Sequence, residues 1–180
     1  MIKELAKQLK YKSPDLITRP IGRDMYSLII KKIKNVNEGE TIIIDFEEIK
    51  VIDSSFIDEC LIKLLIDSVD SEKPFYIKFK NITNVAEANI AAIIGSYSIY
   101  AKKRLVLITD EIRSNNSFFI GELQLEEKDL FDYVRINSIV SLEDLEQFTK
   151  KDSKEILPLI EKLFSLRIIR KIDRFTYSKV

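Results

Sequence analysis

Apolar residues form short continuous runs that alternate with helix-spaced segments over the first two thirds of the chain. Ile42, Ile43 and Ile44 are an unbroken β-branched run ending at Asp45, which predicts a strand buried on both faces. Strand, helix, strand, helix, strand is the order of a sheet with helical crossovers, so we expect an α/β fold. After a first helix at 22–35, the later elements are expected at 54–69 (helix), 75–80 (strand), 85–102 (helix) and 105–109 (strand).

The helix at 85–102 carries several small residues. Ala88, Ala91, Ala92 and Gly95 recur along it, and we expect them to let the helix approach the sheet closely. Further upstream, a short helix and then an extended piece near Leu16–Thr18 are expected before Pro20, because the residue before a proline favours extended backbone.

Residues 110–121 show no periodicity and hold polar clusters and a glycine, which predicts a domain boundary. We therefore divide the chain into domains at 1–120 and 121–180. The second domain is expected to hold three helices and a two-stranded hairpin. The helices are predicted at 125–134, from 140–141 onward, and at 153–166. Ser141-x-x-Asp144, at the start of the second of these, is a capping pattern. Pro158 should kink the last helix or mark a late first turn.

The second predicted helix begins at a polar turn, Asp53-Ser54-Ser55. Ser55-x-x-Asp58 has the spacing of a capping box, so one interpretation is that the serines only cap the helix. The other is that a phosphate on a serine would meet the positive helix end, a gain of about 0.3–1 kcal/mol, while nearby carboxylates repel it. In that case a phosphate would switch contacts rather than stabilise the fold.

Composition narrows the function classes. Lysine plus arginine equals aspartate plus glutamate, 29 each, which disfavours a uniformly basic nucleic-acid binder. Histidine is absent, and with it the commonest general base and metal ligand. The single cysteine, Cys60, is expected to pack inward as an unreactive thiol, which suits a reducing cytoplasm. No signal peptide or membrane helix is expected, and we expect a cytoplasmic protein.

The segment IDFEEIKVIDSSFIDE resembles the STAS-like family of unknown function, as do Arg19–Arg23 (RPIGR) and Phe79–Thr83 (FKNIT). The resemblance covers about residues 15–110 and implies a STAS-like mixed sheet in a bacterial regulator. STAS domains of the anti-sigma factor antagonist type bind a kinase-type partner and are switched by serine phosphorylation. By position the modified serine corresponds to Ser54, although Phe56 stands where their motif has glycine. The resemblance thus implies partner switching with a histidine-kinase-like ATPase, through a surface comprising Asp45, Asp53, Ser54, Ser55 and Asp58.

The C-terminal part resembles a winged helix-turn-helix, on VSLEDL and LIEKLFSLRIIR. Such a domain binds either DNA or protein, and the pattern specifies a fold better than a ligand. If it binds DNA, the candidate contacts are Lys150, Lys151, Lys154, Arg170, Lys171 and Arg174. Acidic residues such as Glu126 and Glu143 weaken that attraction, and a DNA-binding transcription regulator is the alternative function.

Enzymatic activity is disfavoured. Asp45, Asp53, Asp58 and Glu59 could be mistaken for a catalytic or magnesium-binding set, but the sequence offers no companion base, nucleophile pair or phosphate cradle. We expect no cofactor and no metal.

Overall fold

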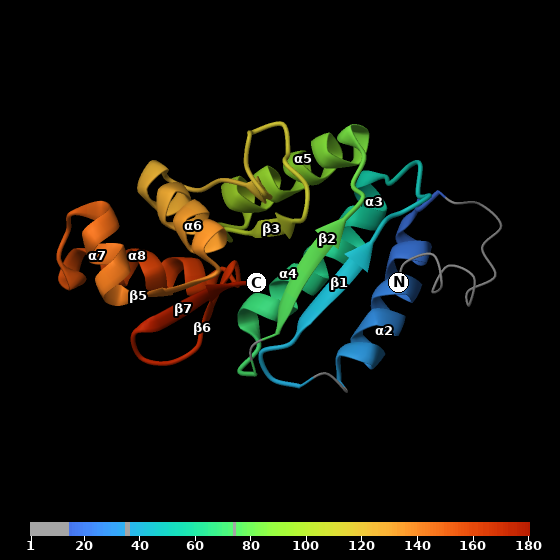
Figure 1. Ribbon diagram of the computed structural model, residues 1–180. Coiled ribbons are helices and arrows are strands. Elements are labelled where there is room, and N and C mark those ends of the chain that lie inside the picture. Colours follow the sequence, from blue (N-terminus) through green and yellow to red (C-terminus); the bar gives the residue numbers. More distant parts are fainter. Residues whose placement is uncertain (1–14, 35–36, 74) are drawn as a thin grey trace. The chain divides into compact units, whose positions relative to one another are not determined.

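The computed structural model describes residues 15–34, 37–73 and 75–180 (Figure 1). The chain folds as two compact units, the first ending at Glu122 and the second spanning Leu123–Val180. The short helix expected at the N-terminus falls mostly within residues 1–14, outside the described part. The extended piece that follows it is present, because Leu16 makes a parallel bridge with Ile52.

The first unit is built on a four-stranded mixed sheet. Its strands are β1 (Thr41–Asp45), β2 (Tyr76–Lys80), β3 (Val106–Thr109) and β4 (Phe119–Gly121), in that spatial order. β1, β2 and β3 run parallel, and β4 pairs with β3 antiparallel. The α/β class with helical crossovers is therefore confirmed. β4 was not predicted, because it is short and lies in the segment 110–121 that shows no periodicity.

Helices cover one face of this sheet. They are α2 (Arg19–Ile33), the continuous run α3 (Ser54–Phe56), η1 (Ile57–Ile62, a π-helix) and α4 (Lys63–Asp70), and α5 (Asn84–Tyr100). The strand residues that join the helices in one hydrophobic core alternate along each strand, as in Ile77 and Phe79 of β2. This hydrophobic core thus lies on one side of the sheet, and on the other side Tyr76, Val106, Ile108 and Phe119 are also buried.

The first strand departs from its prediction. Ile44 is fully buried, but Ile43 is 45% exposed. Successive side chains of a strand point to opposite faces, and Ile43 points away from the face that the helices cover. The expectation that β1 is buried on both faces is therefore wrong. A β-branched run reports strand propensity, and here it does not report burial.

The small residues of α5 also depart from their prediction. The residues that pack on the sheet are Ala86, Ile90 and Ile94. Ala88, Ala91 and Ala92 are exposed, and a Cβ added at Gly95 would meet nothing within 4 Å. Ala88 and Ala92 therefore point away from the sheet, and Ala91 and Gly95 border a groove beside it. The expectation that these residues allow close helix–sheet approach is wrong.

The second unit holds α6 (Leu125–Asn137), β5 (Ile139–Ser141), α7 (Leu142–Thr149), α8 (Ser153–Ser165), β6 (Ile169–Lys171) and β7 (Thr176–Lys179). Its three strands form an antiparallel sheet in the order β5-β7-β6. The capping box of Ser141 and Asp144 is confirmed. β5 was not predicted, and α8 continues through Pro158, which rules out a late first turn.

Within the described ranges, no helix has both the length and the apolar character needed to cross a membrane.

Candidate functional site

The predicted site is the turn that leads into α3, and backbone pairing fixes its position. Leu16 N–H donates to Val51 O at 2.8 Å, and Asp53 N–H donates to Leu16 O at 3.1 Å. Leu16 and Ile52 are both buried. Because neighbouring side chains in extended backbone point oppositely, Ile17, Val51 and Asp53 point outward.

Asp53 caps the helix. Its backbone is extended, and its Oδ1 accepts a hydrogen bond from Phe56 N–H at 2.7 Å. Its Oδ2 accepts from Thr18 N–H at 3.1 Å. Thr18 has a φ of 83°, a left-handed conformation that non-glycine residues seldom adopt. The Asp53 carboxylate thus accepts hydrogen bonds from a free N–H group of the first helical turn and from Thr18, the strained residue that precedes α2.

The serines do not cap. The capping box predicted for Ser55 and Asp58 is wrong, because Asp53 occupies the N-cap position and the serines are the first two helical residues. Among the described residues, neither serine hydroxyl has a hydrogen-bond partner. Ser54 is exposed and Ser55 is half-buried. The Ser54 hydroxyl is therefore accessible and has no structural task within the described part of the chain.

Asp58 belongs to a charged network that ties α2 to the following helices. Arg19 Nη1 lies 2.8 Å from Asp58 Oδ2 and 2.9 Å from Glu59 Oε1. These hydrogen bonds raise the pKa of the Arg19 guanidinium, and the bond to Asp58 has the larger effect. Tyr97 donates its hydroxyl to Asp58 Oδ1 at 2.7 Å. Burial, and then this bond, raise the pKa of Tyr97 to about 12. Asp58 was predicted to contact a partner, and the structure gives it an internal role.

Glu59 is the fourth residue of the acidic set considered as a possible catalytic or magnesium-binding site, and it is buried. Hydrogen bonds from Lys63 and then from Arg19 lower its pKa. The network can form because α2 comes very close at Gly22. A Cβ there would lie 2.8 Å from Glu59 Cβ and 3.3 Å from Phe56 Cα. The glycine of the RPIGR segment therefore positions Arg19 beside the turn.

Asp45 belongs to a separate network at the ends of the parallel strands. Its Oδ1 accepts from Asn81 Nδ2 at 2.7 Å and from Glu47 N–H at 2.9 Å. These hydrogen bonds lower the pKa of Asp45, and the bond from Asn81 has the larger effect. Of the five residues predicted to meet a partner, Asp45, Asp53 and Asp58 thus hold the local structure together, and Ser54 is the exposed one.

Two exposed apolar residues lie at the turn that precedes Ser54, and sequence reasoning missed them. Ile17 is 41% and Val51 is 44% exposed, and both flank Asp53 on the outward side of the Leu16–Ile52 bridge. We call Ile17, Val51 and Ser54 the Ser54 surface. Nothing in the local pattern marks these two residues as exposed, because the bridge that orients them joins segments 36 residues apart. Arg19 and Tyr97 were missed for the same reason, although the RPIGR segment had singled out the region of Arg19.

Cys60 is fully buried on the inner side of η1, as expected. Burial raises the pKa of its thiol. Among the described residues, no three cysteine or acidic side chains are arranged so that they could hold a metal ion.

In the second unit, ion pairs already engage part of the predicted DNA-contacting set. Lys151 pairs with Glu126, and Lys171 Nζ lies 2.6 Å from Glu161 Oε1. Arg174 stacks over the Phe175 ring at 5.1 Å, and Arg170 is half-buried. Lys150 and Lys154 are exposed, near the start of α8.

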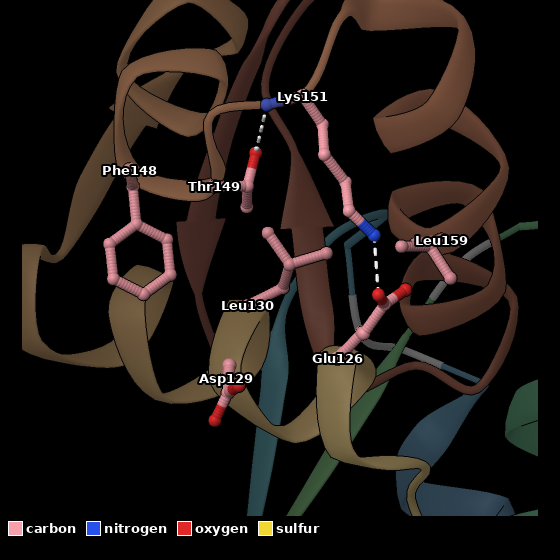
Figure 2. Close-up of a pocket in the computed structure, with 7 residues that line it drawn as sticks. All are labelled: Glu126, Asp129, Leu130, Phe148, Thr149, Lys151 and Leu159. Atoms are coloured by element: carbon pink, nitrogen blue, oxygen red, sulfur yellow. Dashed lines mark hydrogen bonds and ion pairs between the residues drawn. The ribbon is translucent and has the colours of Figure 1, made fainter.

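Lys151 also borders a hollow of about 250 Å³ between α6 and the α7–α8 turn. Figure 2 shows its side chain reaching past Leu130 to Glu126, with Phe148 at the opposite end. Asp129 adds a second carboxylate to the lining. With two carboxylates and one lysine that is already paired, this hollow is not built to attract a phosphate.

Comparisons with known proteins bear on the first unit. Residues 27–87 match the family model described as a STAS-like domain of unknown function (DUF4325). The matched segment contains β1, the Asp53–Ser54 turn and β2, and the four-stranded mixed α/β sheet is consistent with such a fold. The second unit lies outside the match. No curated protein and no solved structure matches the chain. Over residues 27–87, therefore, the protein is similar to a STAS-like domain of unknown function.

Proposed function

We propose that the first unit is a non-enzymatic regulatory module that docks a second protein on the Ser54 surface and acts by partner switching. One observation carries the proposal. Asp53 caps the helix, so the exposed Ser54 hydroxyl at the helix start has no hydrogen-bond partner in the described part of the chain. The exposed apolar side chains of Ile17 and Val51, on the segments that lead to the turn, would contribute apolar contact to a protein partner.

The partner we propose is a histidine-kinase-like ATPase, from the STAS resemblance, in the cytoplasm. Phosphorylation of Ser54 would add about two negative charges to this small apolar surface. Arg19, a cation at the start of α2, is already engaged by Asp58 and Glu59, and the Asp53 carboxylate adds repulsion. A phosphate would therefore weaken docking, which is the switching step.

The test uses the full-length chain and a purified histidine-kinase-like ATPase from the same genome, with binding measured by calorimetry. Ser54→Asp should weaken binding at least about tenfold, because it places a charge in an apolar contact. Ser54→Ala should bind as wild type does. Ser27→Asp is the matched control, since Ser27 is exposed on α2 of the same unit. If Ser54→Asp binds as tightly as wild type, the proposed docking surface is wrong.

Phosphorylation is tested separately by intact mass after incubation with the ATPase and ATP. Wild type should gain one phosphate and Ser54→Ala should gain none. Equal modification of both proteins would remove Ser54 from the mechanism.

For the second unit we propose a winged-helix arrangement that contacts protein. The element order α6, β5, α7, α8, β6, β7 and the β6–β7 hairpin support it. The tip of that hairpin carries Ile172, 55% exposed, and Phe175, 48% exposed. Exposed apolar side chains at a hairpin tip suit a protein surface better than a phosphate backbone.

DNA binding is the second candidate, favoured by the same element order. It predicts binding of the full chain to duplex DNA that weakens steeply with salt. Glutamate substitution of Lys154, which is exposed on α8, should then reduce affinity at every sequence tested. Binding that is independent of salt, or unchanged by Lys154→Glu, would exclude this candidate.

A further inference from the structure

α5 is apolar on both its sides. Ile90 and Ile94 face the core, yet the outward side carries no charged residue from Ala88 to Ala101. A helix at the surface of a globular protein normally places charged and polar residues on its outward side. The outward side of α5 therefore has the character of a contact surface.

The outward apolar residues follow the spacing of paired helices. Val85, Ala88, Ala92, Gly95 and Ile99 are separated by alternating steps of three and four residues, which is the spacing of positions that meet along a helix–helix contact. Val85 is 64% and Ile99 is 61% exposed, and Ala88 and Ala92 are exposed too. We call these five residues the α5 seam.

A second helix could approach this seam closely. Alanine and glycine at its centre leave room for a neighbouring backbone, and the space over Gly95 is open to 4 Å. A groove of about 230 Å³ runs along one flank, between α5 and the strand ends at Leu105 and Gly121. The groove is mainly apolar, and it widens the surface available to a partner.

We propose that the α5 seam pairs with the same seam of a second copy of this chain, antiparallel, about a two-fold axis at Ala92. The order of residue sizes identifies this partner. Val85 and Ile99 lie seven residues before and after Ala92, so the two-fold places Val85 of each copy against Ile99 of the other. Ala88, four residues before the axis, then lies opposite Ser96 and next to Gly95, and Ala92 meets its own counterpart. Large residues thus face each other at both ends, and small residues face each other in the middle.

Charge supports the same partner. A symmetric contact brings identical groups together near its axis, and any charge there would face its own kind. The α5 seam has no charge to repel, so it is complementary to itself. One helix pair makes an interface at the small end of the specific range, below about 1,200 Å², so the dimer is weak, with a Kd on the order of 10–100 µM.

The test is sedimentation of the full-length chain over a range from about 5 to about 500 µM, which spans the expected Kd. Wild type should shift from monomer to dimer across this range. Ala92→Lys and Ala92→Glu should each remain monomeric, because each places like charges on the axis. Ala101→Lys is the matched control, an exposed alanine at the end of the same helix but off the seam, and it should dimerise as wild type does.

Mixing the two charged variants tests the position of the axis. A one-to-one mixture of Ala92→Lys and Ala92→Glu should form a heterodimer, because residue 92 of one copy lies opposite residue 92 of the other. A wild type that stays monomeric throughout would overturn the proposal, whether the second unit or another partner covers the seam. So would an Ala92→Lys variant that still dimerises, or a mixture that does not associate. None of these results depends on Ser54.

Discussion

Replacing Asp53 with alanine should destabilise the first unit far more than replacing either serine beside it. Asp53 accepts two backbone hydrogen bonds, from Phe56 at 2.7 Å and from Thr18 at 3.1 Å. Loss of an N-cap side chain costs about 0.5–2 kcal/mol. Loss of the hydrogen bond from Thr18 N–H costs about 1 kcal/mol more. That bond also restrains Thr18 at its unusual φ of 83°. The expected cost of Asp53→Ala is therefore about 1.5–3 kcal/mol.

Ser54→Ala and Ser55→Ala should each change the stability by no more than about 0.5 kcal/mol, because neither hydroxyl has a hydrogen-bond partner in the described part of the chain. Asp53→Asn keeps one good acceptor oxygen and should fall between these limits. Hydrogen exchange of the amides in residues 54–70 reports the opening of this helical run directly, without requiring the two units to unfold together. If a serine variant costs more than Asp53→Ala, the assignment of the cap is wrong, and so is the inference that Ser54 is free for another role.

Three further outcomes concern Arg113, Tyr177 and Asp45. Arg113 lies 3.5 Å from Glu87 and donates to Ile82 O at 2.9 Å, so Arg113→Met should cost about 3 kcal/mol by denaturation, and a smaller cost for the double variant with Glu87→Gln would confirm the pairing. Tyr177 is fully buried, and its hydroxyl has no partner among the described residues; Tyr177→Phe should leave the thermal midpoint unchanged or raise it, whereas a lower midpoint would reveal a hidden partner. Hydrogen bonds lower the pKa of Asp45, so its contribution to stability is complete above the unfolded pKa of about 3.9 and is lost as pH falls through the lower folded value; the first unit should lose stability on acidification, and Asp45→Asn should reduce that loss.

The sequence predicted the order of the main elements because those elements carry strong local signals. β-branched runs, apolar residues at helical spacing and the box of Ser141 and Asp144 all act within a few residues. β4 and β5 escaped detection because each has only three residues and is defined by pairing with a distant strand.

The site was harder to predict, because its geometry depends on contacts between distant segments. The pattern located the Asp53–Ser54 turn, but a capping box was assigned to Ser55, two residues too late. Serine and aspartate are both good caps, and only the backbone conformation of Asp53 distinguishes them. The prediction that the small residues of α5 face the sheet was wrong for a related reason. Periodicity identifies an apolar face, but α5 has one on each side, so it could not show which of them meets the sheet.

Protection from hydrogen exchange on partner binding tests the docking claim most directly. The full-length chain would be compared with and without a saturating amount of the histidine-kinase-like ATPase. We predict slower exchange at residues 16–18 and 51–58 in the wild-type complex, and clearly less slowing at those residues when Ser54→Asp is mixed with the same amount of ATPase. Protection confined to the second unit, or equal protection of the Ser54→Asp variant, would contradict the account.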